Sequence, residues 1–301
     1  MTYSKCITIL TPTYNRADYL GRLYESLVSQ TNQDFQWLVI DDGSTDETEK
    51  IVSSFKGHSF ELVYKKKKNG GKHTALNYSH PYIDGQFVCI VDSDDYLLPD
   101  AINCITSKIN QYSSKRNIKV LVFQRGNAYY EPLCDSFGTD DIISNNIDFI
   151  VNGKRTGDCC EVISSDVLKE FPFPEYENEK FLGEGYLWCH EGFLYDTVYI
   201  PRVIYICEYL EGGLSKSGRK LRLMCPKGGM ANCNAFFNSS NNRKVRKDIL
   251  RKKAILFVCY GKFSGLDRKG ILNAAIDRKM ISRCYVLGLA LYYYWKNKYK
   301  I

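Results

Sequence analysis

Four apolar, β-branched runs succeed one another within the first 100 residues, and each is followed by a helical or polar segment. They read CITILTP, FQWLVID, FELVYK and QFVCIVD. Residues 17–30 separate the first two runs and carry their leucines on one helical face. Strands that are apolar almost throughout and alternate with helices are typical of a parallel sheet covered on both faces. The first 100 residues therefore predict an α/β fold.

Polar residues come directly after three of these runs. Residues 12–15 end or follow the first run, 41–44 the second and 92–95 the fourth. Ligands of such sheets bind at the carboxyl ends of the parallel strands. We therefore expect the three segments to lie along one rim of the sheet and to form a ligand site.

The acidic run at the end of the fourth strand contains Asp92, Asp94 and Asp95. Three carboxylates within four residues repel one another unless a cation neutralises them. Mg²⁺ and Mn²⁺ prefer hard oxygen ligands and take one or two carboxylates together with substrate phosphates. The run predicts a divalent-metal site, and a solvated acidic turn is the alternative.

The second run ends in Asp41 and Asp42, with Ser44 and Thr45 close behind. A carboxylate at this position can accept hydrogen bonds from a base N–H or from ribose hydroxyls. The alternative is a capping turn, in which Ser44 or Thr45 caps a helix near residues 46–55. The segment is thus a candidate for nucleotide contacts.

A further segment, NGGK at residues 69–72, precedes another helical stretch. Its glycines let the backbone approach a ligand closely, and Lys72 can reach a phosphate. This segment is expected to face the same ligand.

In order and spacing, these motifs resemble glycosyltransferase family 2. The matching pieces are PTYN at 12–15, DDGSTD at 41–46, NGGKHTALN at 69–77 and DSD at 92–94. The resemblance covers about residues 5–210. It implies the GT-A fold, a Rossmann-like and mostly parallel sheet flanked by helices, and a transfer reaction that inverts the sugar.

The resemblance also implies roles for single residues. Pro12, Thr13 and Tyr14 would line the nucleotide pocket, while Asp42 would contact the base with Asp41 close by. The alternative is that Thr13 and Tyr14 are ordinary loop residues.

The resemblance also gives Lys72, Asp92 and Asp94 roles in binding the nucleotide. Lys72 would lie near the base and phosphates, Asp92 near the ribose, and Asp94 would bind Mn²⁺ or Mg²⁺ beneath the diphosphate.

The general base of the family lies in an acidic pair at the start of a helix. Here the segment reads LGEGYLW, so Glu184 is present and Gly185 stands where the family has Asp. Glu184 is the first candidate for the base, followed by Glu191, with His190 as a further base or metal contact. The alternative is that His190 and Glu191 are surface residues of a helix.

The resemblance implies an enzyme, a hexosyl- or N-acetylhexosaminyltransferase of cell-surface or capsular polysaccharide synthesis. Its donor would be a UDP-sugar and its acceptor a saccharide, in one hypothesis a lipid-linked one. A non-catalytic nucleotide-sugar-binding or scaffold subunit is the alternative, supported by Gly185. A nucleotidyltransferase would need a Gly-rich phosphate loop after the first strand, and a NAD-linked dehydrogenase would need G-x-G-x-x-G there. The chain has PTYNRADYL instead.

Charge divides the chain into two parts. Residues 1–214 carry 20 Lys and Arg against 31 Asp and Glu, a net charge of −11, whereas residues 215–301 carry 21 against 3, a net charge of +18. We expect a catalytic domain at 1–214, with a nucleotide half at about 1–100 and an acceptor half at about 101–214. A basic helical extension at 215–301 would face an anionic partner.

Near the C-terminus, CYVLGLALYYYW at 284–295 is followed by Lys296, Lys298 and Lys300. The two alternatives are an interfacial helix on an anionic membrane and a last core helix packed on the catalytic domain. Nucleic acid is not expected, because no recognition motif accompanies the charge. No signal peptide or run of ~18 apolar residues is evident, so we expect a cytoplasmic protein, peripheral on the inner face of the membrane if the helix is interfacial. YLEGGLS at 209–215 resembles the mobile segment that closes over the nucleotide in family members.

Overall fold

A computed structural model describes residues 3–112, 114–115, 117–207, 214–240 and 242–301. The segment expected to close over the nucleotide lies, from 209 to 213, outside these residues. The chain divides into two compact units. The first comprises Met1–Asn145, Arg155–Pro172 and Tyr195–Glu208, and the second Asn146–Lys154, Phe173–Leu194 and Tyr209–Ile301.

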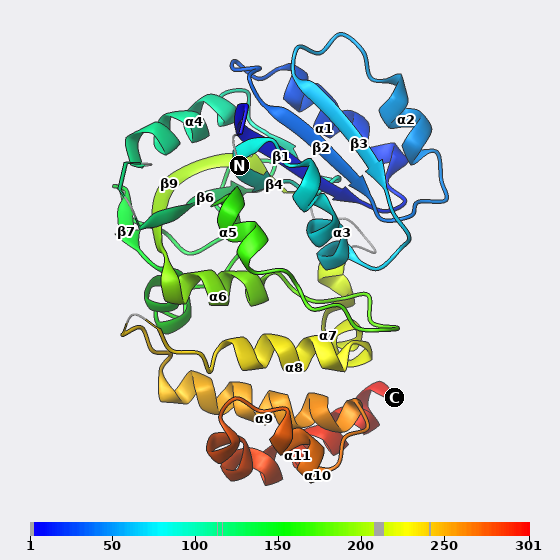
Figure 1. Cartoon of the computed structure of the whole chain (residues 1–301), viewed down its shortest axis with the longest axis vertical. Helices are drawn as coiled ribbons and strands as arrows, with labels where there is room; N and C mark the ends of the chain where they lie inside the picture. The colour runs from blue at the N-terminus through cyan, green and yellow to red at the C-terminus, as the bar shows by residue number, and fades with distance from the viewer. Residues whose placement is uncertain (1–2, 113, 116, 208–213, 241) are drawn as a thin grey trace. The chain divides into compact units, whose positions relative to one another are not determined.

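One sheet organises the first unit, with the strand order β3-β2-β1-β4-β8-β6-β9-β5 and β7 paired with β9 (Figure 1). Its strands are β1 (Lys5–Thr13), β2 (Gln36–Asp41), β3 (Glu61–Lys66), β4 (Gly85–Ile90), β5 (Tyr96–Leu97), β6 (Ile118–Gly126), β7 (Ile142–Ser144), β8 (Cys159–Ser164) and β9 (Asp196–Ile206). Neighbours among β1, β2, β3 and β4 are parallel. β8 runs antiparallel between β4 and β6, and β6 and β9 are again parallel.

Helices flank this sheet because both of its faces are apolar. Every residue of β2 is buried. The flanking helices are α1 (Ala17–Val28), α2 (Thr48–Ser54), α3 (Lys72–Ser79), α4 (Ala101–Tyr112) and α5 (Ser165–Glu170), with a 3₁₀ turn at His80–Tyr82. α1, α2 and α4 share one apolar core with the strands. α3 and α5 contact the strands outside that core. The predicted α/β fold is confirmed.

The second unit is helical. It contains α6 (Gly185–Leu194), α7 (Leu214–Met224), α8 (Pro226–Ala235), α9 (Lys247–Phe263), α10 (Arg268–Asn273), α11 (Arg278–Tyr299) and a π-helical turn at Ile147–Asn152. The predicted basic helical part is therefore present. The units do not follow the expected boundary at residue 214, because Ile147 and Phe193 pack in one cluster with Ala235 and Phe236. Where the catalytic domain ends remains a prediction.

One face of α11 packs on α9. Ile281, Cys284, Gly288 and Trp295 are buried along it. A Cβ atom at Gly288 would lie 2.5 Å from Cβ of Val258, so the glycine allows the two helices to approach closely. This face of α11 is therefore buried within the helical unit, and whether the helix also lies on a membrane remains a prediction. Within the described part of the chain, none of the helices has both the length and the apolar character needed to cross a bilayer.

Candidate active site

Three of the polar segments predicted to form the site lie at the carboxyl ends of neighbouring parallel strands. In the register of β1 with β2, Thr13 is the partner of Asp41. In the register of β1 with β4, Leu10 is the partner of Ile90, two residues before Asp92. The rim expected from the sequence therefore exists in the first unit.

The loop after β1 and the turn after β2 are hydrogen-bonded to each other. The Asn15 N–H donates to Oγ of Ser44 at 2.9 Å, and the Thr45 N–H donates to Oδ1 of Asn15 at 2.8 Å. Asn15 has a φ of 51°, a left-handed conformation that asparagine tolerates well. The capping prediction for Ser44 and Thr45 is wrong, because α2 begins only at Thr48 and has no side-chain cap.

Asp41 is fully buried, and both of its carboxylate oxygens accept hydrogen bonds. Oδ1 accepts from the Ser44 N–H at 2.7 Å, and Oδ2 accepts from the Tyr64 hydroxyl at 2.5 Å. Burial, followed by this bond, raises the pKa of Tyr64 well above its ordinary value. Asp41 therefore fixes the turn that presents its neighbour Asp42.

Asp42, which is 3% exposed, anchors the NGGK segment. Its Oδ1 accepts from the Gly70 N–H at 2.9 Å and its Oδ2 from the Gly71 N–H at 2.6 Å. Nζ of Lys67 lies 2.8 Å from Oδ1, and the Asn69 side-chain amide donates to Oδ2 at 3.1 Å. Gly71 has a φ of 97°, which favours glycine directly before α3. Asp42 thus orders this loop, and its contact with a base remains a prediction.

The end of β1 combines a buried hydroxyl with an exposed ring. Pro12 is buried, Thr13 is 3% exposed and Tyr14 is 46% exposed. Among the described residues, the Thr13 hydroxyl has no hydrogen-bond partner. A buried hydroxyl without a partner lowers stability, so such a group calls for an explanation. Thr13 is therefore a candidate ligand contact.

Lys72, the first residue of α3, brings its ammonium to Asp92. The ammonium donates to Oδ1 of Asp92, and Nη1 of Arg125 lies 3.6 Å from Oδ2 of the same carboxylate. Burial alone would raise the pKa of Asp92, but the two cations outweigh it and hold this pKa below its usual value. Asp92 is therefore ionised at neutral pH.

Asp94 and Asp95 have different surroundings. Nε of Arg16 lies 3.7 Å from Oδ2 of Asp94, whose side chain is 23% exposed. Asp95 is buried and accepts a hydrogen bond from the Tyr205 hydroxyl at 2.6 Å. Burial, with the charge of Asp92 as the second cause, raises the pKa of Asp95 to about 6. Of the two, Asp94 is the carboxylate accessible to a ligand.

These cations and hydroxyls offset the repulsion from which we predicted a metal, so repulsion alone does not require one. Within the described ranges, no group of three or more His, Cys, Asp or Glu side chains could hold a metal ion. Mg²⁺ and Mn²⁺ commonly take only one or two protein carboxylates when phosphates complete the coordination. The partly exposed carboxylate of Asp94 fits that donor set, and its role as a ligand remains a prediction.

The candidate bases lie in the second unit, at and within α6. Glu191 is 1% exposed, so the surface alternative is wrong for this residue. His190 is half-buried, which lowers its pKa, and its ring centre lies 4.5 Å from that of Tyr186. Glu184 is also half-buried, directly before the helix. The choice of base among these residues remains a prediction.

Packing does not explain the glycine at position 185. A Cβ atom at Gly185 would have only an ordinary contact, 3.6 Å from Nδ2 of Asn232. The position therefore has room for a side chain, and the departure from the family's acidic pair has no steric cause.

Sequence reasoning missed three residues that contact the predicted ones: Lys67, Arg125 and Tyr205. Lys67 lies in a run of four lysines at residues 65–68, and the ordinary interpretation of such a run is a solvated strand end. Arg125 and Tyr205 lie in the apolar runs VLVFQR and VIYICEY, where a buried polar side chain must find a partner. That rule could have identified them as candidates, although not their partners.

Residues 8–126 match the family model described as Glycosyl transferase family 2. The chain is 30% identical over 141 residues to Glycosyltransferase GlyA of Streptococcus pneumoniae, covering 43% of this chain and 20% of the relative. It is 28% identical over 189 residues to a Campylobacter jejuni protein, covering 60% of this chain and 58% of the relative. That protein is named GalNAc(5)-diNAcBac-PP-undecaprenol beta-1,3-glucosyltransferase. The chain thus spans a fifth to under two thirds of the length of these relatives.

Among solved structures, the chain resembles S. aureus TarS 1-349 in complex with UDP. The TM-score is 0.65 with 15% sequence identity, and the similarity covers 100% of this chain and 91% of the other. At this identity, the likeness concerns the fold. The order of the motifs and the match over 8–126 agree, so this part of the chain is similar to glycosyl transferase family 2, and the sheet has the GT-A fold.

Proposed function

We propose that this protein transfers a sugar from a UDP-sugar to a saccharide acceptor, with inversion, in the synthesis of a bacterial surface polysaccharide. The observation that carries the proposal is the convergence of Thr13, the loop anchored by Asp42, the pair Lys72 and Asp92, and Asp94 on one rim. Each of these lies within the segment that matches the family.

On the donor side, the proposed pocket is formed by residues of the sheet rim. Thr13 and the loop held by Asp42 would contact the nucleoside. Lys72, already paired with Asp92, provides a positive charge near the diphosphate. When bound, Mg²⁺ or Mn²⁺ would stabilise the negative charge of the diphosphate leaving group, and Asp94 would hold it.

On the acceptor side, Glu184 is the proposed general base. A carboxylate in that role takes the proton of the acceptor hydroxyl as this oxygen attacks the anomeric carbon. Glu191 is the second candidate. In this proposal, the nucleotide half covers about residues 1–100 and the acceptor half about 101–214.

A lipid-linked acceptor is part of the proposal. The Campylobacter jejuni relative is named for an undecaprenol-linked glycan. The basic helices of the second unit add charge of the sign that an anionic membrane attracts. We place the protein on the cytoplasmic face of the membrane on these grounds.

The experiment is a panel of labelled UDP- and GDP-sugars offered to the full chain with Mn²⁺, with and without lipid-linked saccharides. Release of UDP together with a labelled glycoside of inverted configuration is expected. Donor binding without turnover would instead favour the non-catalytic subunit, for which Gly185 is the supporting observation. Pyrophosphate release from UTP and a sugar phosphate would identify a nucleotidyltransferase. Either result would overturn the proposed transfer.

A further inference from the structure

Helix α11 has a second apolar face. This face is exposed, whereas the first one packs on α9. Val286, Leu287, Tyr293 and Tyr294 are exposed at 76%, 46%, 56% and 58%. Because a helix repeats every 3.6 residues, this spacing places them on one stripe. A single exposed apolar residue is ordinary, but a continuous stripe is typical of a surface that binds something.

Cations border the stripe at both ends. Arg278, Lys279 and Arg283 lie in the first two turns, and Lys296 and Lys298 lie in the last. The sequence from residue 278 to 301 contains no Asp or Glu. Aromatic and aliphatic residues flanked by Lys and Arg are typical of helices that lie in the headgroup region of anionic membranes.

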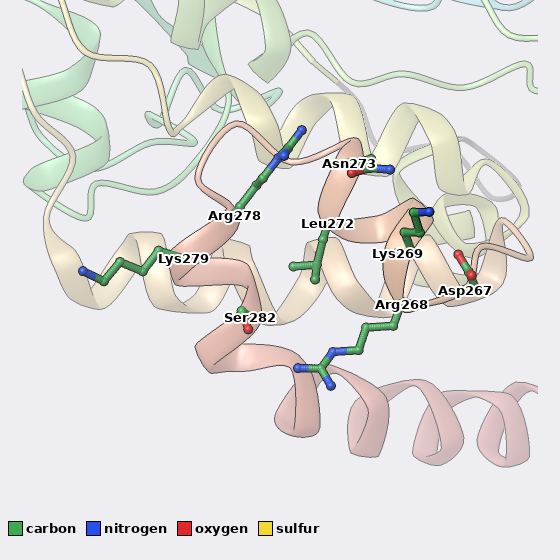
Figure 2. A pocket seen from close by; sticks show the side chains of 8 residues that line it. All are labelled: Asp267, Arg268, Lys269, Leu272, Asn273, Arg278, Lys279 and Ser282. Atoms are coloured by element: carbon green, nitrogen blue, oxygen red, sulfur yellow. The ribbon is translucent and has the colours of Figure 1, made fainter.

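A basic hollow of about 680 Å³ adjoins the start of α11, lined by α10 and the first turns of α11 (Figure 2). Its acidic residue, Asp267, uses Oδ1 to accept the N–H of Gly270 at 2.7 Å. Figure 2 shows the side chains of Arg268, Arg278 and Lys279 pointing in different directions. Side chains that diverge in this way do not converge on one small anion.

We infer that the stripe on α11 and the adjoining basic hollow together bind the surface of an anionic phospholipid bilayer. The apolar side chains enter the headgroup region, while the cations face lipid phosphates. A second copy of this chain fits less well, because its own α11 would bring like charges together. Nucleic acid offers the cations a partner but leaves the apolar stripe uncovered. The inference does not depend on the proposed transfer activity.

The first test measures co-sedimentation of the full chain with phosphatidylglycerol vesicles and with phosphatidylcholine vesicles. In one variant, Lys269, Lys279 and Arg283 are all replaced by Gln, which keeps the helices and removes three exposed charges. Each charge lost near an anionic surface lowers the partition coefficient roughly fivefold, so the triple variant should bind on the order of 100-fold more weakly. Arg268 is left in place because its guanidinium packs 5.2 Å from the centre of the Tyr285 ring.

A matched control removes the same charge from the first unit. Its substitutions are Lys50→Gln, Lys56→Gln and Lys115→Gln, all at exposed positions. This control should bind vesicles nearly as the unaltered protein does.

A third variant, with Val286→Gln and Tyr293→Gln, separates insertion from charge. High salt screens the attraction between charges but not apolar burial. The unaltered protein should therefore keep a salt-resistant bound fraction that this variant loses. Circular dichroism and UDP affinity should be the same for all four proteins, since the substitutions lie outside the donor rim.

Three results would each overturn the inference. They are no binding to phosphatidylglycerol vesicles, equal binding to phosphatidylcholine vesicles, and a triple variant that binds as the control does. A failure of sugar transfer, by contrast, would leave the vesicle result unchanged.

Discussion

The guanidinium of Arg125 lies over the ring of Tyr205, 4.3 Å from its centre. The two residues are register partners in β6 and β9. The Tyr205 hydroxyl donates to Asp95 and accepts the N–H of Asp92 at 3.0 Å. Arg125 also lies close to the Asp92 carboxylate. This pair therefore ties the acidic run to the far half of the sheet without help from a metal.

Replacement of Asp94 should consequently affect catalysis and not folding. Asp94→Asn removes the proposed metal ligand but leaves the contacts of Arg125 and Tyr205 intact. We expect transfer activity to be abolished and UDP affinity in Mn²⁺ to fall, with thermal unfolding unchanged. Calorimetric titration with UDP checks this, and Asp140→Asn, at an exposed position, is the control. Near-normal activity of Asp94→Asn would rule out the metal assignment.

Removal of the Thr13 hydroxyl should raise the stability of the protein and lower its affinity for UDP. Thr13→Val keeps the shape of the side chain and removes a buried hydroxyl that has no partner among the described residues. The unfolding free energy should rise by about 1–3 kcal/mol, the usual penalty of such a group. UDP affinity should fall if the nucleotide accepts or donates a hydrogen bond there. Denaturant unfolding and calorimetry measure the two effects, and an unchanged affinity would exclude Thr13 as a ligand contact.

The two glutamates of the α6 region should differ in what they change. Glu184→Gln is expected to lower kcat by a factor of ~10² or more with little effect on UDP affinity, the usual result of losing a general base. Glu191 is buried, so Glu191→Gln should mainly alter the melting temperature. Single-turnover rates and melting curves of both variants distinguish these outcomes. If only Glu191→Gln loses turnover, the base is Glu191.

Lys253 should reduce the stability of the second unit at neutral pH. Desolvation lowers the pKa of this lysine, whose Nζ lies 3.6 Å from the centre of the Phe236 ring. The folded state thus disfavours its ammonium form relative to the unfolded chain. Lys253→Met should therefore raise both the unfolding free energy and the melting temperature.

The sign of the pH dependence follows from the lowered pKa. At neutral pH the ammonium is present in both states, so the destabilisation is complete. It disappears as the pH rises from the folded pKa to the unfolded value near 10.4. The advantage of Lys253→Met should therefore shrink between neutral and strongly alkaline pH. Urea unfolding across that range tests this, with the exposed Lys252→Met as control, and an advantage that grows with pH would contradict it.

The rim of the sheet could be predicted because it depends on local patterns. Apolar runs define the strands, and the residues that end them, such as Thr13, Asp41 and Asp92, must share an edge when the strands are parallel. The partners of these residues depend on long-range packing. That Asp42 would accept the backbone N–H groups of Gly70 and Gly71 could not be inferred from spacing.

The division into units could not be predicted for a related reason. The helical pattern of α6 shows which residues are apolar, but not which distant segment they will pack against. Phe193 joins Phe236 and Val245 in one cluster, which assigns α6 to the helical unit. Net charge, from which we drew the boundary at residue 214, reports the surface and carries no information about that core.

The anchoring of the Gly70–Gly71 loop by Asp42 has a thermodynamic consequence. A loop that is disordered before its ligand arrives loses conformational entropy on binding, and this loss weakens the affinity. Here two backbone N–H groups, one lysine and one asparagine converge on a single carboxylate, and the protein makes all of these contacts by itself. A nucleotide that meets this loop finds most of the ordering complete. The heat-capacity change of nucleotide binding should then be small, because little of the loop folds when the nucleotide binds.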